Sequence, residues 1–152
     1  MYLAAIILLM LVLPAGCVIG QIAWSGAVDV MLLVGKWFVF WMVGVRLFMA
    51  GVRQVVQPQF TAESIFAIRD RAAFAIVREV GFANLATGTL GLASLAVPAW
   101  LVPAAIVGGL YYGLAAVGHA FRRGRNFSEQ MALVSDVFAF VILAAFVASR
   151  GF

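Results

Sequence analysis

A small set of polar and ionisable side chains lies within or at the ends of long apolar segments of this sequence. Acidic, basic, amide and imidazole groups in one place could bind a small ligand, a lipid headgroup or a proton. An ionisable group inside a membrane-spanning segment costs about 2.5–3.5 kcal/mol on insertion scales, so such groups are paired or functional. The five candidate ligand or ion contacts are Arg46, Glu79, Asn84, His119 and Asp136.

These five residues allow two explanations. In the first, the arginines pair with the two acidic residues, and Asn84 and His119 complete the hydrogen bonds, because buried charges require partners. In the second, the same groups line a polar pocket that is open to the cytoplasm. Helical spacing favours an inward direction for Glu79, while the neighbouring Arg78 reaches the lipid headgroups.

Enzymatic and metal sites have little support in the sequence. It contains no nucleophile motif, phosphate-binding loop or metal-spaced set of His and Glu residues. Cys17 is the single cysteine, which excludes an internal disulfide. His119 is the single histidine and has no obvious axial partner for haem. We expect no catalytic residue, no metal and no cofactor.

Composition indicates a membrane protein. Of the 152 residues, 66% are hydrophobic and 11% are charged. A soluble domain of this size would expose large apolar patches, so lipid must be its solvent. The formal net charge is +4, but nucleic-acid-binding proteins cluster Lys and Arg on a polar surface. Here the arginines flank apolar runs, so we expect a lipid bilayer as partner and no nucleic acid.

The chain is predicted to form one all-α domain, a polytopic transmembrane helical bundle over 1–152. A spanning helix needs about 20 apolar residues. We retain the first segment as a span rather than a signal peptide because no basic residue precedes it; four spans remain if it is not a true span. The five predicted spans are about 2–23, 28–52, 77–97, 101–121 and 131–149.

The basic residues predict the orientation. With the N-terminus in the cytoplasm, only Lys36 and Arg150 face outward, and the other eight face inward, as the positive-inside rule requires. We therefore predict a multi-pass protein of the bacterial inner membrane with a cytoplasmic N-terminus and an outer C-terminus. The eight inward-facing residues are Arg46, Arg53, Arg69, Arg71, Arg78, Arg122, Arg123 and Arg125.

The long connection before the third span is predicted to hold an amphipathic juxtamembrane helix at about 62–76. Pro58 ends the second span, and Thr61 is a candidate N-cap. Apolar residues recur on one face and charged residues on the other, as in a helix at the membrane interface. This helix would serve as an anchor, or alternatively as a docking site for a partner.

Small residues predict how the spans pack, because close approach drives helix association in lipid. They recur every four residues on both the third and the fourth spans. Since a short hairpin joins these spans, the two stripes are expected to face each other. The stripes are Ala83, Thr87 and Gly91, and Ala105, Gly109 and Gly113.

Several segments resemble an uncharacterised family of small multi-pass bacterial integral membrane proteins, a domain of unknown function. The run VREVGFANL is the most distinctive, and the resemblance covers much of the chain. It implies a bacterial membrane protein and assigns no catalytic residue. The matching segments are 35–41 (GKWFVFW), 60–62 (FTA), 77–85 (VREVGFANL) and 134–136 (VSD).

We therefore expect a non-enzymatic structural or partner-binding membrane component, a homo-oligomer or part of a larger membrane complex. A partner would need an exposed stripe, for which Trp37, Phe38 and Trp41 are candidates. The alternative is a small transporter or channel that uses the polar cluster and therefore needs a path across the membrane. A further alternative is a lipid- or quinone-binding subunit of a membrane enzyme.

Overall fold

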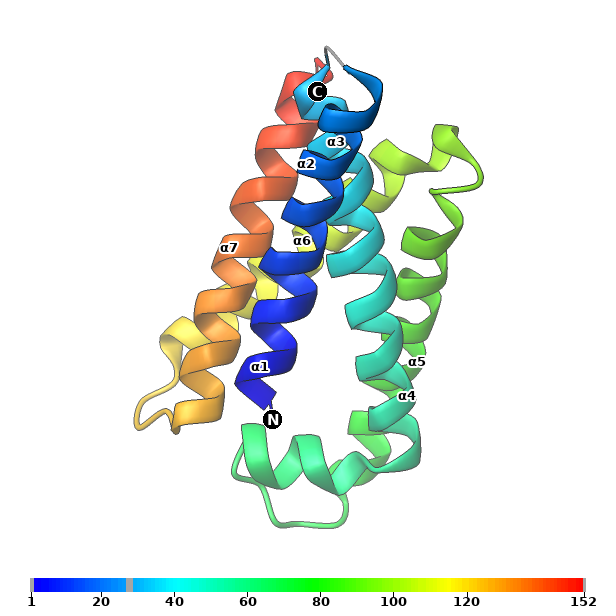
Figure 1. Cartoon of the computed structure of the whole chain (residues 1–152). Helices are drawn as coiled ribbons and strands as arrows, with labels where there is room; N and C mark the ends of the chain where they lie inside the picture. Colours follow the sequence, from blue (N-terminus) through cyan, green and yellow to red (C-terminus); the bar gives the residue numbers. More distant parts are fainter. Residues whose placement is uncertain (1, 27–28, 152) are drawn as a thin grey trace.

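The computed structural model describes residues 2–26 and 29–151, and these form helices joined by turns and short irregular connections. Figure 1 shows an elongated bundle whose long helices run roughly along one axis. The N-terminus and the connections 57–72 and 122–126 lie at one end, called here the N-terminal end. The C-terminus lies at the other end, with the connection 94–100.

The first helical rod contains a wide turn next to a proline. It runs through α1 (Tyr2–Ile7), the π-helical η1 (Leu8–Val12) and α2 (Leu13–Ser25). Pro14 lacks an N–H, and its ring crowds the carbonyl four residues earlier, which is Met10 in η1. A π-turn is the usual local adjustment to such an interruption.

The second rod comprises α3 (Val30–Phe38), the π-helical η2 (Val39–Arg46) and α4 (Leu47–Val56). Asp29 caps its start, since the carboxylate accepts a hydrogen bond from the backbone N–H of Leu32 at 2.9 Å. The remaining elements are η3 (Phe60–Ile65), α5 (Ala73–Ala93), the 3₁₀ turn η4 (Pro98–Trp100), α6 (Leu101–Phe121) and α7 (Phe127–Ser149).

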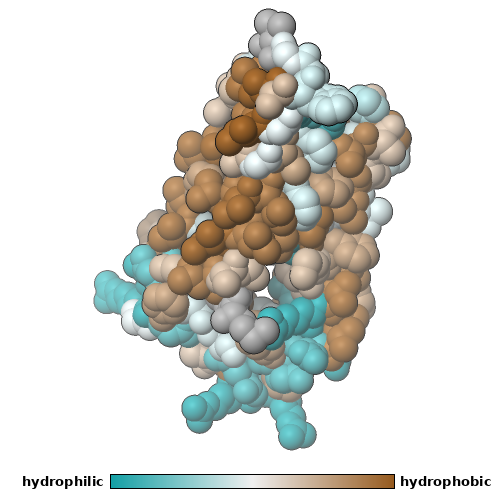
Figure 2. Space-filling view, viewed as in Figure 1, coloured by the Kyte–Doolittle hydropathy of each residue, from teal (hydrophilic) through white to brown (hydrophobic). Residues whose placement is uncertain are grey.

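Four helical segments of the described chain are long and apolar enough to cross a membrane. They are Leu3–Ser25, Val30–Val56, Pro98–Phe121 and Phe127–Ser149. The 21-residue α5 is not among them, because Arg78, Glu79 and Asn84 lower its mean hydropathy. Figure 2 shows an apolar band along the molecule and a strongly hydrophilic N-terminal end.

The predicted continuous helix at 62–76 is wrong. A helical stretch ends at Ile65, residues 66–72 are irregular, and α5 begins at Ala73. Ala67 has φ +56°, a left-handed conformation that ends a right-handed helix. The backbone N–H groups of Phe66 and Ile68 close this end on carbonyls of the preceding turn, at 3.2 and 2.8 Å. The predicted N-cap, Thr61, lies buried inside η3 instead.

The central core lies between η2, α6 and α7. Val39, Met42 and Val43 of η2 are fully buried. They belong to one apolar cluster with Leu143 and Phe146 of α7, both also fully buried. This apolar layer fills the middle of the bundle and separates the polar residues near its two ends.

The predicted contact between the small-residue stripes of the third and fourth spans is wrong. α5 packs mainly against α4 and η2, and α6 packs mainly against α7. A Cβ on Gly91 would lie 2.5 Å from the backbone nitrogen of Gly44, and one on Gly88 2.5 Å from that of Phe48. Small residues permit close approach, but their spacing does not identify the neighbour. The second rod and α5 meet along a row of glycines, called here the glycine seam: Gly44 of η2, Gly51 of α4, and Gly81, Gly88 and Gly91 of α5.

Candidate functional site

A buried ion-pair network joins η2, α6 and α7 in the N-terminal half of the bundle. Asp136 lies 3.4 Å from the Arg46 guanidinium through its Oδ1 and 3.9 Å from His119 Nε2 through its Oδ2. The other ring nitrogen of His119 lies 3.3 Å from Glu129 Oε1, which is 3.1 Å from Arg122 Nε. His119 therefore bridges two buried carboxylates, each of which also contacts an arginine.

The helices place each member of this network at a definite level. Arg46 is the last residue of η2, and Asp136 lies nine residues after the first residue of α7. His119 is in the last turn of α6, and Glu129 is in the first turn of α7. Because 1.5 Å separates successive residues, Asp136 lies about 10 Å deeper along α7 than Glu129. The Glu129 and Asp136 side chains therefore approach the two nitrogens of the His119 ring from different levels, at 3.3 and 3.9 Å.

Aromatic rings and hydroxyls complete the surroundings of Arg46. Its Nη2 donates to Ser135 Oγ at 3.2 Å, and its guanidinium lies 5.1 Å from the centre of the Tyr112 ring. Tyr112 is fully buried, and its hydroxyl donates to the backbone carbonyl of Met42 at 2.5 Å. The Arg46 guanidinium and the hydroxyls of Ser135 and Tyr112 therefore each have a partner that compensates for their loss of water.

The connection 57–72 closes the N-terminal end of the network. The Phe66 ring stacks on His119, with 5.8 Å between the ring centres and 14° between the planes. Arg122 donates to the backbone carbonyl of Phe66 at 2.7 Å. Asn126 donates to the carbonyls of Ser64 and Ile65, at 3.2 and 3.4 Å. The irregular segment that replaces the predicted helix thus covers the histidine.

Asn84 lies in a second buried polar contact. Its Nδ2 donates to Gln54 Oε1 of α4 at 2.8 Å, and its Oδ1 is buried without a hydrogen-bond partner among the described residues. Tyr111 of α6 lies within interaction range of Asn84, Arg46 and Asp136. The structure therefore brings four of the five predicted residues, from four helical rods, into one polar region.

Glu79 does not join this region. It is exposed on α5 and makes no hydrogen bond or ion pair with the described part of the chain. Arg78 is also exposed. The predicted inward direction of Glu79 assumed a continuous helix from residue 62 onward, and the break at 66–72 changes the phase of α5.

Sequence reasoning missed Glu129, although it is 3% exposed and central to the network. The available signal was Asn126-Phe-Ser-Glu129, the pattern of a helix N-terminus with an acidic residue in its first turn. Asn126 is the N-cap and accepts a hydrogen bond from the Glu129 N–H at 2.9 Å. Gln54 and Tyr112 were also missed, since neither carries a charge.

The aromatic residues proposed as an exposed partner stripe make contacts within the chain, and Trp37 and Trp41 are half-buried. Trp37 Nε1 donates to Gln21 Oε1 at 2.7 Å, and Trp41 Nε1 lies 3.4 Å from Cys17 Sγ. Phe38 is buried. The contacts of Trp37 and Trp41 join the first rod to the second, so the three residues do not form a fully exposed stripe.

An exposed ion pair lies at the opposite end of the bundle. Both terminal nitrogens of Arg150 donate to the Asp29 carboxylate at 2.9 Å. These hydrogen bonds, followed by that from the Leu32 N–H, lower the pKa of Asp29 to about 2. The pair links the start of α3 to the end of α7.

The comparisons place the chain in a family. The model of a family described as "Family of unknown function (DUF6790)" matches residues 2–150. The chain belongs to this family. The match confirms the predicted resemblance to an uncharacterised family. No curated protein and no solved structure matches the chain.

The arrangement has clear chemical consequences for this member of the DUF6790 family. The two arginines, Arg46 and Arg122, balance the charges of the two buried carboxylates, Asp136 and Glu129. Among the described residues, no group of three or more His, Cys, Asp or Glu side chains could hold a metal ion. These ion pairs hold α6, α7 and η2 together, and they are the main structural role that the geometry of the candidate site supports.

Proposed function

We propose that the chain is a multi-pass protein of the bacterial inner membrane with five spans, a cytoplasmic N-terminus and an outer C-terminus. The length of α5 and its alignment beside α4 support a fifth span, since 21 residues extend about 31 Å. The connections 57–72 and 122–126 lie at the N-terminal end in Figure 1 and carry many of the arginines. The positive-inside rule places that end in the cytoplasm.

Within that membrane, the chain acts as a structural or partner-binding component without chemistry of its own. The observation that carries this proposal is the pairing of the buried carboxylates with Arg46, His119 and Arg122. A transport path needs polar groups from one side of the membrane to the other. The buried apolar layer of Val39, Met42 and neighbouring residues counts against such a path.

The outer face of α5 is the surface that we propose for a partner. α5 lies mainly against the second rod, so its far side has little cover from the chain. Ala83, Ala86 and Thr89 are exposed in the middle and later turns of α5, beyond the exposed Glu79. Small residues let a second transmembrane helix approach closely. The partner is another copy of this chain or a helix of a larger membrane complex.

Reporter fusions test the topology. A reporter active only in the cytoplasm, fused after residue 126, is expected to be active, and one fused after residue 151 to be inactive. A reporter active only outside should give the opposite pattern. If both fusion points lay on the same side of the membrane, the predicted span between them, α7, would not cross it, and the five-span proposal would fail.

Cysteine cross-linking in native membranes tests the partner surface. In a Cys17→Ser background, Ala86→Cys is expected to form cross-linked dimers or a discrete larger adduct. The matched control is Ala144→Cys, an exposed alanine at a similar distance from the helix end on α7. Equal cross-linking at both positions, or none at Ala86, would contradict an interface on α5.

Proteoliposomes test the transport alternative. With an imposed membrane potential and an internal pH-sensitive dye, the protein is expected to carry no proton flux above that of protein-free vesicles. A flux that Asp136→Asn abolishes would overturn the structural proposal. Glu79→Gln serves as the comparison, since Glu79 lies outside the network.

A further inference from the structure

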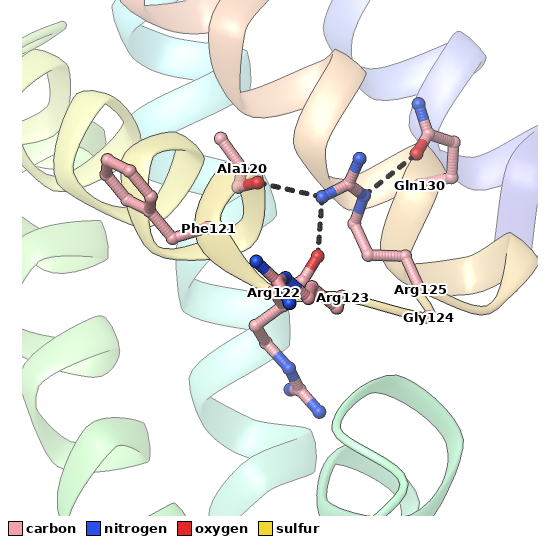
Figure 3. A pocket seen from close by; sticks show the side chains of 7 residues that line it. All are labelled: Ala120, Phe121, Arg122, Arg123, Gly124, Arg125 and Gln130. Carbon is pink, nitrogen blue, oxygen red and sulfur yellow. Dashed lines mark hydrogen bonds between the residues drawn. The ribbon is translucent and has the colours of Figure 1, made fainter.

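The cytoplasmic connection between α6 and α7 forms an open, basic cleft. It has a volume of about 640 Å³ and is lined by residues 120–125 and Gln130 (Figure 3), called here the arginine cleft. Arg125 Nη1 donates to the carbonyls of Ala120 and Arg122 at 2.9 and 2.7 Å, and its Nε donates to Gln130 Oε1 at 3.1 Å. These bonds hold the Arg125 guanidinium in one position in the cleft.

A free positive charge lines the same cleft. Arg123 is exposed and makes no hydrogen bond or ion pair with the described residues. Arg125 Nη2 likewise has no acceptor in the described part of the chain. Gly124 has φ +72°, so the chain turns sharply between these two arginines. The cleft therefore offers unused donors and positive charge at the membrane surface.

An apolar groove continues from this cleft along the same two helices. It has a volume of about 430 Å³, and its lining is almost wholly apolar. Ala120 lines both the cleft and the groove. Gln130 of the cleft precedes Leu133 and Val137 of the groove at helical spacing, so all three lie on one face of α7. The other groove residues are Leu110, Gly113, Leu114, Ala116, Val117 and Phe140.

The length of the groove fits one acyl chain. From Leu110 to Ala120 the helix rises about 15 Å, which is half of the roughly 30 Å hydrocarbon core and hence one leaflet. Gly113 has no side chain, so the Phe140 ring of α7 packs directly against it; a ring carbon would lie 2.8 Å from an added Cβ. The groove thus starts at the headgroup level and ends near the middle of the bilayer.

We propose that the arginine cleft and the apolar groove together bind one anionic glycerophospholipid of the inner leaflet. The phosphate lies beside Arg123 and Arg125, and one acyl chain lies between α6 and α7. Basic pockets between helices on the cytoplasmic side suit such headgroups. Charge complementarity and the shared Ala120 favour a lipid over a partner helix, which would leave the arginine cleft unfilled. The inference goes beyond the proposed structural role but depends on insertion into a bilayer.

Native mass spectrometry of the detergent-purified full chain tests the proposal. The probes are phosphatidylglycerol and phosphatidylethanolamine with identical acyl chains, and inorganic phosphate as competitor. We expect one phosphatidylglycerol to bind more tightly than phosphatidylethanolamine. Arg123→Gln should lower the phosphatidylglycerol affinity about fivefold, from roughly 1 kcal/mol per arginine near an anionic surface. The matched control is Arg78→Gln, which removes another exposed arginine and should leave the affinity unchanged.

A second pair of variants tests the groove. Ala120→Trp should weaken binding of both lipids, whereas Ala4→Trp, at an exposed alanine of α1, should not. Ala120→Leu gives a milder test should the Trp variant fail to fold. Equal affinity for the two lipids, equal effects of the two arginine variants, or full competition by inorganic phosphate would overturn the proposal. Dimers that dissociate with Ala120→Trp would also overturn it, because a second copy would then fill the groove. Reporter topology is independent of all these outcomes.

Discussion

The two antiparallel helix pairs α4–α5 and α6–α7 pack by different means. The first pair relies on the glycine seam, where backbone meets backbone, and on one neutral hydrogen bond between Gln54 and Asn84. The second carries the buried ion-pair network, in which His119 contacts Glu129 and Asp136. In lipid, both close packing and polar contacts can hold helices together. The first pair therefore depends on close packing of glycines, and the second depends on compensation of buried charges.

The largest effect is expected from removing one charge of the network. The Arg46 side chain is only 16% exposed, and Asp136→Leu removes the carboxylate that lies beside its guanidinium. Breaking a buried pair in this way costs about 3 kcal/mol or more. The measurement is the free energy of unfolding in mixed micelles, titrated with SDS and followed by circular dichroism. A loss below about 1 kcal/mol would mean that the α6–α7 side does not depend on charge compensation.

A smaller effect is expected from the glycine seam. Gly91→Ala places a methyl group 2.5 Å from the Gly44 backbone nitrogen, so the two helices must separate. Overpacking of this kind costs about 1–3 kcal/mol. The matched control is Gly20→Ala on α2, where no atom lies within 4 Å of the added carbon. The same SDS titration should show no loss for the control, and equal losses would remove the steric explanation.

The neutral contact of the α4–α5 pair should matter less. Asn84→Ala removes the 2.8 Å hydrogen bond to Gln54 Oε1. Polar contacts between transmembrane helices contribute about 0.6 kcal/mol on average. Loss of the unsatisfied Asn84 Oδ1 offsets part of this cost. A double-mutant cycle with Gln54→Ala measures the coupling energy between the two side chains. A coupling energy above about 2 kcal/mol would mean that this neutral contact stabilises the chain as much as the charged contacts do.

The exposed Asp29–Arg150 pair should give the smallest effect and a definite pH dependence. Because the folded pKa of Asp29 is about 2, below the 3.8 of an unperturbed carboxyl, the unfolded state binds the proton more readily. The contribution is therefore complete above about pH 5 and lost as the pH falls from about 4 to 2. Asp29→Asn keeps an N-cap residue but removes the charge. Its difference in Tm from the native chain should be visible at pH 7, shrink as the pH falls below about 4, and vanish only below pH 2. A difference that grows in acid would contradict the assignment.

The sequence predicts where the long apolar helices lie better than it predicts which helices pack against each other. The predicted span 101–121 coincides with α6, because prolines and arginines bound a continuous apolar run. Spans 28–52 and 77–97 overlap the structure, but helix bounds shift by several residues. The small-residue stripes correctly predicted that helices pack closely there, but they did not identify the helix on the opposite side. That choice depends on the three-dimensional path of the whole chain.

The candidate site was predictable where a charge interrupts an apolar segment. Arg46, His119 and Asp136 met this condition, and the structure brings them together. Glu129 was missed because an acidic residue at a helix start has a local explanation as part of a cap. Glu79 was misplaced because a left-handed Ala67 ends the preceding helical stretch and resets the phase of α5.

The most direct test of the account is a double-mutant cycle on Arg46 and Asp136. If the network is structural, Arg46→Leu and Asp136→Leu should each destabilise the chain by about 3 kcal/mol, because each leaves one buried charge. The double variant should recover to within about 1 kcal/mol of the native chain, since leucines replace both charges. Additive losses near 6 kcal/mol, or single variants as stable as the native chain, would contradict mutual compensation as the role of these residues.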